Sequence, residues 1–266
     1  MSSHESPYEA RLKFALSAAD SAGHLILKFY QSANLAVEPK RDSSPVTEAD
    51  RGAELLIREL IEQQFPRDGV LGEEFGETVG SSGYRWILDP VDGTKSFIHG
   101  VPLFGTLIGL EHEGDCVVGV CRFPALKETI YASRGSGAWW ARDDGPAQRA
   151  RVSAIKKMSD ALFCITTITG WERTGKQPAF DRLCRAAGLT RGWGDCYGHI
   201  LVATGRADVM VDPAMNPWDA AALVPILEEA GGCFMDWKGN TSIHSGNGVS
   251  VNADLREDVL QLLQGE

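Results

Sequence analysis

The stretch Trp86-Ile87-Leu88-Asp89-Pro90-Val91-Asp92-Gly93-Thr94-Lys95-Ser96-Phe97 decides the fold class. The apolar residues before Asp89 predict a buried strand, and the glycine and hydroxyl after Asp92 predict a turn into a helix. Asp89 is therefore expected to leave a sheet at its carboxyl end, where open α/β sheets place their ligand sites. Two carboxylates three residues apart are oxygen ligands suited to Mg²⁺, and the N–H groups of Gly93 and Thr94 can bind phosphate oxygens.

Three further segments carry carboxylates beside predicted turns or helix starts. Leu71-Gly72-Glu73-Glu74-Phe75-Gly76 places an acid pair in a glycine-bounded turn. Asn216-Pro217-Trp218-Asp219-Ala220-Ala221-Ala222 places one acid at the start of an apolar helix, and Pro45-Val46-Thr47-Glu48-Ala49-Asp50 leads into another helix. Taken singly, these acids are equally compatible with helix caps or surface charges.

In this order and spacing, the motifs resemble those of the inositol monophosphatase-like, Mg²⁺-dependent phosphatases. That family shares a Gly-Glu-Glu turn, an Asp-Pro-Ile/Val-Asp-Gly-Thr motif and a later Trp-Asp-x-Ala motif, and the resemblance covers nearly the whole chain. Alternating helix and strand blocks predict a layered α/β architecture. The resemblance implies a two-lobed αβαβα sandwich of the inositol monophosphatase and fructose-1,6-bisphosphatase type. We expect an N-terminal lobe over residues 1–145, with most metal ligands and catalytic residues, and a C-terminal lobe over residues 146–266.

The resemblance also implies a set of metal ligands. Glu73, Asp89 and the Val91 carbonyl would hold a first Mg²⁺ ion, while Asp89, Asp92 and Asp219 would hold a second. A third ion, with mostly water ligands, is implied near Glu73. Two ions would let one activate the attacking water while the other stabilises the leaving oxygen.

The nucleophile is expected to be metal-activated water, because no Gly-x-Ser-x-Gly elbow or plausible Cys–His pair is present. By resemblance, Thr94 would hydrogen-bond this water and pass its proton character to Asp50. Asp50 is equally compatible with the N-cap of the following helix. Glu74 would support the site from beside Glu73. Lys40 matches a family lysine near the catalytic water, although alone it would be interpreted as a solvated lysine.

Two acids in the second lobe are expected to set the substrate. Asp195 stands where inositol monophosphatases usually carry a small residue or threonine, and Asp212 matches a substrate-binding acid of the family. A close opposite charge strengthens binding, so these acids suit a substrate with an amine or imidazole. The runs Asp89 to Gly100 and Leu223 to Ile226 look most like the histidinol-phosphate phosphatase branch. Asp195 is also compatible with a cap on the following helix.

We therefore predict a Mg²⁺-dependent phosphomonoesterase that converts histidinol phosphate and water to histidinol and phosphate, a step of histidine biosynthesis. The alternatives are an inositol-1-monophosphatase, a related sugar or nucleotide phosphatase, a haloacid-dehalogenase-type enzyme and a non-catalytic metal-binding scaffold. The dehalogenase motif separates its two aspartates by one residue, whereas Pro90 and Val91 intervene here. A scaffold is disfavoured because every matched site residue is present.

Composition narrows the partners and the location. The net charge of −10 argues against nucleic acid, because no basic run is available to neutralise phosphates. Bound divalent cations would reverse the local sign and admit an anionic substrate. The six cysteines form no Cys-x-x-Cys pair, which indicates reduced thiols in a cytoplasmic protein. No signal peptide and no membrane span are predicted. A homodimer is expected only because relatives commonly form one.

Apolar periodicity and turn residues predict the remaining elements. The predicted helices are Tyr8 to Phe29, Ala53 to Phe65, Pro178 to Ala187, Cys196 to Gly205, Asp219 to Ala230 with a kink or break at Pro225, and a last helix capped by Asp254. The predicted strands are Thr106 to Glu111, Cys116 to Phe123, Glu128 to Ala132, Ala161 to Thr167 and Ala207 to Asp212. Arg142 to Pro146 is the best boundary signal in the middle of the chain.

Overall fold

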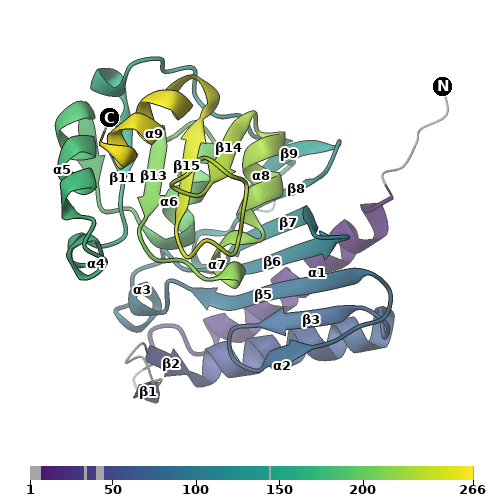
Figure 1. Ribbon diagram of the computed structural model, residues 1–266. Helices are drawn as coiled ribbons and strands as arrows, with labels where there is room; N and C mark the ends of the chain where they lie inside the picture. Colours follow the sequence, from purple (N-terminus) through teal and green to yellow (C-terminus); the bar gives the residue numbers. More distant parts are fainter. Residues whose placement is uncertain (1–6, 33–34, 40–44, 144, 266) are drawn as a thin grey trace.

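Five alternating layers of helices and sheets make up the computed structural model (Figure 1). The structure describes residues 7–32, 35–39, 45–143 and 145–265. Two helices lie on the outer face of an eight-stranded sheet, and its inner face packs on a central helical layer. A five-stranded sheet covers the other side of that layer and is itself covered by further helices. The predicted αβαβα layering is confirmed.

The larger sheet has the strand order β10-β9-β8-β7-β6-β5-β3-β4. Its strands are β3 (Gly69–Gly72), β4 (Gly76–Thr78), β5 (Tyr84–Asp92), β6 (Gly105–His112), β7 (Asp115–Phe123), β8 (Glu128–Ser133), β9 (Gly137–Arg142) and β10 (Gln148–Arg149). All neighbouring pairs are antiparallel except β3 and β5, which run parallel. The strand β10 follows residue 145 and pairs with β9, so the larger sheet extends past the predicted lobe boundary. The division into two lobes stays a prediction.

The smaller sheet has the order β12-β11-β13-β15-β14. Its strands are β11 (Leu162–Cys164), β12 (Leu189–Arg191), β13 (Val209–Asp212), β14 (Gly232–Met235) and β15 (Gly248–Asn252), and a separate ribbon pairs β1 (Val37–Pro39) with β2 (Pro45–Thr47). The strand predicted from Ala161 to Thr167 is shorter than expected, since β11 covers only Leu162–Cys164 and the next helix begins at Ile168.

The helices divide among the three helical layers. They are α1 (Glu9–Leu27), α2 (Glu48–Gln64), α3 (Thr94–Ile98), α4 (Ile168–Arg173), α5 (Gln177–Ala186), α6 (Asp195–Ala203), α7 (Pro217–Ala220), α8 (Leu223–Glu229) and α9 (Arg256–Gln264). The short helix α4 was not predicted. No helix among the described residues is long and apolar enough to cross a membrane.

Side-chain alternation along the strands assigns each sheet face to a helical layer. In β5, Trp86 and Leu88 belong to the core beneath α1 and α2, whereas Ile87 belongs to the core shared with α6 and α8. In β13, Met210 faces this central layer, while Val209 packs among residues of α5 and α9. The central helices are thus buried between two sheets, as their apolar sequences predict.

A pair of glycines lets the central helical layer lie directly on the larger sheet. Gly109 of β6 and Gly119 of β7 are register partners. A Cβ atom on Gly109 would lie 2.7 Å from the Cβ of Ala221, and one on Gly119 would lie 2.0 Å from the carbonyl oxygen of Ala222. Neither position has room for a side chain, so the junction between α7 and α8 touches the strand backbones.

Pro225 breaks the predicted apolar helix into α7 and α8. Proline has no N–H to donate, so the bond that would run from residue 225 to the Ala221 carbonyl is missing. The predicted interruption is confirmed. The cap predicted for the last helix is wrong: Asn252 accepts the Leu255 N–H at 3.0 Å, and Asp254 lies inside the turn that precedes α9. An asparagine two positions earlier reaches the open N–H group instead.

Candidate active site

An irregularity at the end of β5 positions the two acids of the central motif. The pairing of β5 with β6 shifts register between Asp89 and Asp92. Pro90 lies in this interval, where it has no N–H to give to the ladder, and its carbonyl accepts the Thr106 hydroxyl at 2.8 Å. Asp89 Oδ1 accepts the Val91 N–H at 3.0 Å. This bulge changes the direction of the side chains near the end of β5. Asp89 and Asp92 both belong to the strand, whereas Asp89 was expected to lie beyond its end.

Gly93 ends the strand in a conformation that a side chain would obstruct. Its φ angle is +83°, in the left-handed region that favours glycine. A Cβ atom there would lie 2.8 Å from the Leu103 carbonyl oxygen. This turn allows α3 to begin at Thr94, directly after the motif.

Three carboxylates from distant parts of the chain meet at this turn. Single oxygens of Asp89, Asp92 and Asp219 all lie within 4.8 Å of one another. Asp219 reaches the cluster from α7, where it also accepts the Asn216 N–H at 2.7 Å in a capping box. Asp219 therefore completes a helix cap and also lies in the acidic cluster.

Burial and mutual repulsion act on these acids together. Burial, followed by the charges of Glu73 and Asp92, raises the pKa of Asp89 well above its usual range. Burial and then the charge of Asp195 raise the pKa of Asp92 in the same way, and burial raises the pKa of Asp219. A bound cation would offset this repulsion. The all-oxygen donor set fits a hard divalent cation such as Mg²⁺.

Asp195 stands at the start of α6 in a strained backbone conformation. Its φ angle is +51°, and its N–H donates to Thr166 Oγ1 at 2.8 Å. Gly194 occupies the N-cap position without a side-chain cap bond, so Asp195 does not cap the helix. Burial, then the charge of Asp212, raises the pKa of Asp195 to about 7, although Lys95 opposes the shift.

A small cavity of about 80 Å³ opens beside the acidic cluster. It is lined by Asp92, Thr166, Asp195, Cys196, His199, Asp212, Ala214, Met215 and Asp219. The structure therefore brings both predicted substrate acids, Asp195 and Asp212, beside two acids of the cluster, Asp92 and Asp219. His199 was missed, because a lone histidine in an apolar helix is usually interpreted as a core residue. Its place four residues after Asp195 was the available signal.

Thr94 and Asp50 are brought together as the resemblance implied. The Thr94 hydroxyl lies 3.3 Å from Asp50 Oδ1 and 3.0 Å from the Val91 carbonyl oxygen. Asp50 is not the N-cap of α2, since Thr47 takes that position. Asp50 is the third residue of the capping box, and its Oδ2 accepts the Thr47 N–H at 2.9 Å and the Thr47 hydroxyl at 2.5 Å.

The turn that carries Glu73 and Glu74 is held by a buried acid that sequence reasoning missed. The Glu54 side chain is fully buried in α2 and accepts the Glu74 N–H at 2.7 Å and the Phe75 N–H at 3.2 Å. Arg58 Nε donates to the same carboxylate at 2.8 Å. The signal was an acid on the apolar side of the predicted helix. Lys40, also predicted near this region, lies outside the described residues.

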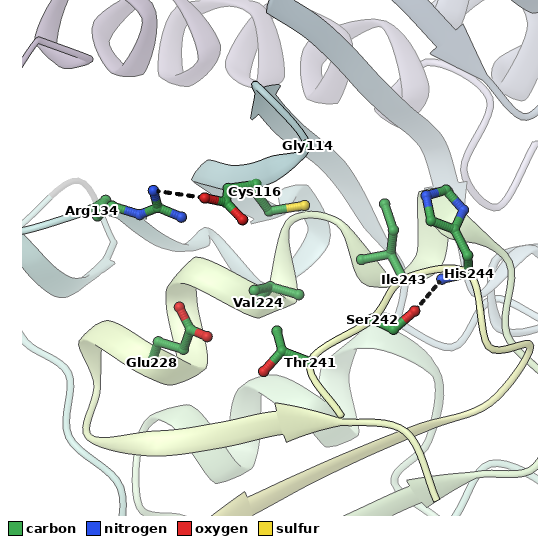
Figure 2. A pocket seen from close by; sticks show the side chains of 10 residues that line it. Gly114, Cys116, Arg134, Val224, Glu228, Thr241, Ser242, Ile243 and His244 are labelled. Atoms are coloured by element: carbon green, nitrogen blue, oxygen red, sulfur yellow. Dashed lines mark hydrogen bonds and ion pairs between the residues drawn. The ribbon is translucent and has the colours of Figure 1, made fainter. Parts of the chain in front are cut away.

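A second pocket, larger at about 310 Å³, lies away from the acidic cluster (Figure 2). It is lined by the start of β7, by α8 and by residues 241–244. Arg134 pairs with Asp115 at 3.3 Å within it, and the His244 N–H donates to Ser242 Oγ at 3.2 Å. None of the motif carboxylates lines this pocket, so the chemistry predicted from the sequence belongs to the smaller cavity.

Comparisons with known proteins identify the family of the chain. The chain matches the model of the inositol monophosphatase family over residues 8–265. It is 52% identical to a histidinol-phosphatase of Chlorobaculum parvum over 91% of this chain and 92% of that protein. It is 37% identical to a histidinol-phosphatase of Mycobacterium tuberculosis, with 95% and 97% covered.

Solved structures give the same result at the level of the fold. The extragenic suppressor protein SuhB of Bartonella henselae superposes with a TM-score of 0.87 at 31% identity, over 96% of this chain and 98% of that one. An inositol monophosphatase from Zymomonas mobilis gives a TM-score of 0.85 at 32% identity, over 98% and 100%. Fold and acidic site together define a metal-dependent phosphatase. The chain belongs to the inositol monophosphatase family.

Proposed function

We propose that this chain is a histidinol-phosphatase, which hydrolyses histidinol phosphate to histidinol and inorganic phosphate. The observation that carries the proposal is that Asp195 and Asp212 line one cavity with Asp92 and Asp219. The first pair would receive the amine or imidazole as charge-assisted partners, while the second pair lies where the phosphate group would meet metal ions. The two relatives that bear this name support the assignment.

The site would take Mg²⁺, as two or three ions. Asp89, Asp92 and Asp219 offer clustered oxygens, and Glu73 lies close enough to raise the pKa of Asp89. The Val91 carbonyl oxygen has two lone pairs, so one is available to a cation even when the other accepts the Thr94 hydroxyl. When bound, Mg²⁺ would offset the charge on the attacking and leaving oxygens.

Thr94 and Asp50 would orient the attacking water and take its proton. When the Thr94 hydroxyl donates to Asp50 Oδ1, its lone pairs are available to accept from a water. The water proton would then pass to Thr94 Oγ1 as the threonine proton passes to Asp50. The two bonds from Thr47 to the other oxygen of Asp50 hold this carboxylate in place.

Several predicted roles complete the proposal. The N–H groups of Gly93 and Thr94 would bind phosphate oxygens, with Lys40 as a further cation, and Glu74 would support the neighbouring acid.

We also propose that the protein is a cytoplasmic homodimer, and that the two lobes of each chain meet at its active site. The six cysteines are free, which fits a reducing compartment. Sedimentation of the purified protein tests the dimer.

A substrate panel tests the proposed function. Phosphate release is measured in Mg²⁺ from histidinol phosphate, inositol 1-phosphate, a nucleotide bisphosphate and fructose bisphosphate. We expect the highest kcat/KM for histidinol phosphate. A higher value for inositol 1-phosphate would reject the histidinol assignment and leave the phosphatase class in place. Absence of hydrolysis on the whole panel would reject the catalytic interpretation.

A further inference from the structure

A buried chain of three polar side chains runs from the interior of the smaller sheet to the cavity. Nδ1 of His199 lies 2.7 Å from Ser250 Oγ, and Nε2 lies 3.2 Å from Asp212 Oδ2. His199 and Ser250 are fully buried, and Asp212 is 8% exposed. Asp212 and His199 line the cavity, whereas Ser250 lies behind them.

Strand register explains why these residues meet. Met210 and Ser250 are partners in the antiparallel pair of β13 and β15, and Asp212 is the partner of Gly248. Residues two apart in a strand share a face, so Asp212 and Ser250 lie diagonally on the same face. His199 of α6 lies between them. The missing side chain at residue 248 leaves Asp212 without a cross-strand side-chain neighbour.

One arrangement of protons would satisfy the hydrogen-bonding groups of all three side chains. A carboxylate only accepts, so the Asp212 contact calls for a proton on Nε2 of His199. A neutral imidazole that carries its proton on Nε2 leaves Nδ1 as an acceptor, and the buried Ser250 hydroxyl supplies the donor. Every hydrogen bond then runs in one direction, from Ser250 through His199 to Asp212.

We propose that His199 and Ser250 are positioning residues that orient Asp212 for substrates with a cationic group, an inference that rests on the proposed function. His199 would occupy Asp212 Oδ2, which leaves Oδ1 as the acceptor for an amine or imidazole in the cavity. A substrate with only hydroxyl groups would gain less from this fixed carboxylate. The pair therefore acts on substrate affinity through Asp212 and touches no reacting atom.

The proton arrangement is tested first, without use of catalysis. Long-range ¹H–¹⁵N spectra of histidine-labelled protein, with His199 assigned by its loss in His199→Gln, should show Nε2 protonated and Nδ1 unprotonated. A proton on Nδ1, with or without one on Nε2, would overturn the inference. In Ser250→Ala the Nδ1 signal should shift, because its donor is gone.

Kinetics then test the effect on the substrate. Ser250→Ala should raise KM for histidinol phosphate about threefold to tenfold, the effect expected for loss of one hydrogen bond, with kcat nearly unchanged. The KM for inositol 1-phosphate should stay within about twofold. Ser250→Thr, which keeps the hydroxyl, should retain a nearly normal KM. Ser133→Ala removes another fully buried hydroxyl, in the larger sheet, and is the matched control.

A double-mutant cycle shows whether the two residues act through Asp212. In an Asp212→Asn background, Ser250→Ala should add no further increase in KM for histidinol phosphate. Additive effects, or an equal rise for both substrates, would show a purely structural role and overturn the inference. Absence of any preference for histidinol phosphate in the unmodified enzyme would overturn the proposed function instead, and the spectra keep the two failures distinct.

Discussion

The backbone N–H of Cys196 donates a hydrogen bond of 2.5 Å to Oδ2 of Asp92, across 104 positions of sequence. This contact joins the first turn of α6 to the end of β5. Asp195, one residue earlier, is thereby held beside the acid cluster. The acid that would read the substrate and an acid that would hold metal are positioned by the same bond.

Asp195→Asn should weaken histidinol phosphate selectively. The amide keeps the side-chain shape but removes the negative charge, and a charge-assisted hydrogen bond of this kind contributes about 1.5–3 kcal/mol, or about one to two decades in kcat/KM. Activity on inositol 1-phosphate serves as the internal control. Equal losses on both substrates would mean that Asp195 supports the structure of the site rather than its specificity.

Asp92→Asn should abolish most activity while the fold survives. The amide oxygen can still accept the Cys196 N–H, so the change removes chiefly the charge offered to a metal ion. We expect kcat/KM to fall at least about a hundredfold, since even outer partners of metal ligands cost 10–100-fold. Phosphate release across a Mg²⁺ titration, with thermal unfolding alongside, measures this. Asp254→Asn, on the exposed turn before α9, is the control, and near-normal activity of Asp92→Asn would refute the ligand role.

Thr94→Val should lower kcat about a hundredfold or more, because the water would lose the hydroxyl that orients it and relays its proton. Thr94→Ser keeps the hydroxyl and should retain most of the rate. Steady-state kinetics at saturating Mg²⁺ separate the two variants. If valine were as active as serine, proton transfer through Thr94 and Asp50 would be excluded.

Glu54→Gln should loosen the turn that carries Glu73. The amide places an NH₂ group where a carboxylate oxygen accepts a backbone N–H, so the free energy of unfolding should fall by about 2 kcal/mol. The Mg²⁺ concentration for half-maximal activity should rise as well. Glu59→Gln, an exposed change in the same helix, is the matched control. A loss of stability with an unchanged Mg²⁺ requirement would limit Glu54 to a structural role.

The metal-free protein should lose stability with rising pH through Asp195. The pKa of this group rises from 3.8 to about 7 on folding, so the folded state keeps a proton that the unfolded state releases. The free energy of unfolding therefore falls as the pH rises from 3.8 to about 7. The Asp195→Asn variant has no proton to release at this position. The Tm of the variant minus the Tm of the unmodified protein should therefore increase by at least about 2 °C between about pH 5 and pH 7. Thermal unfolding in EDTA measures it, and a constant difference would contradict the shift.

The resemblance of short motifs was sufficient to predict that Asp89, Asp92 and Asp219 come together, because each acid is tied to its own turn or helix start. Apolar spacing predicted a helix from Tyr8 to Phe29, and the structure has one from Glu9 to Leu27. The bulge at Pro90 could not be predicted, since it depends on pairing with β6. Glu54 and His199 escaped for a related reason. Each is a polar residue inside an apolar face, and only packing against another element reveals its partner.

The two glycines at the centre of the larger sheet set the geometry of the acid cluster from the interior. Because Gly109 and Gly119 have no side chains, the residues that follow α7 lie against the strand backbones. This close packing brings Asp219 of α7 near Asp89 and Asp92. The spacing between the opposing carboxylates thus depends on how closely the central helices pack on the larger sheet. Evolution of a wider site would have to begin at these backbone contacts, with residues that lie outside the cavity lining.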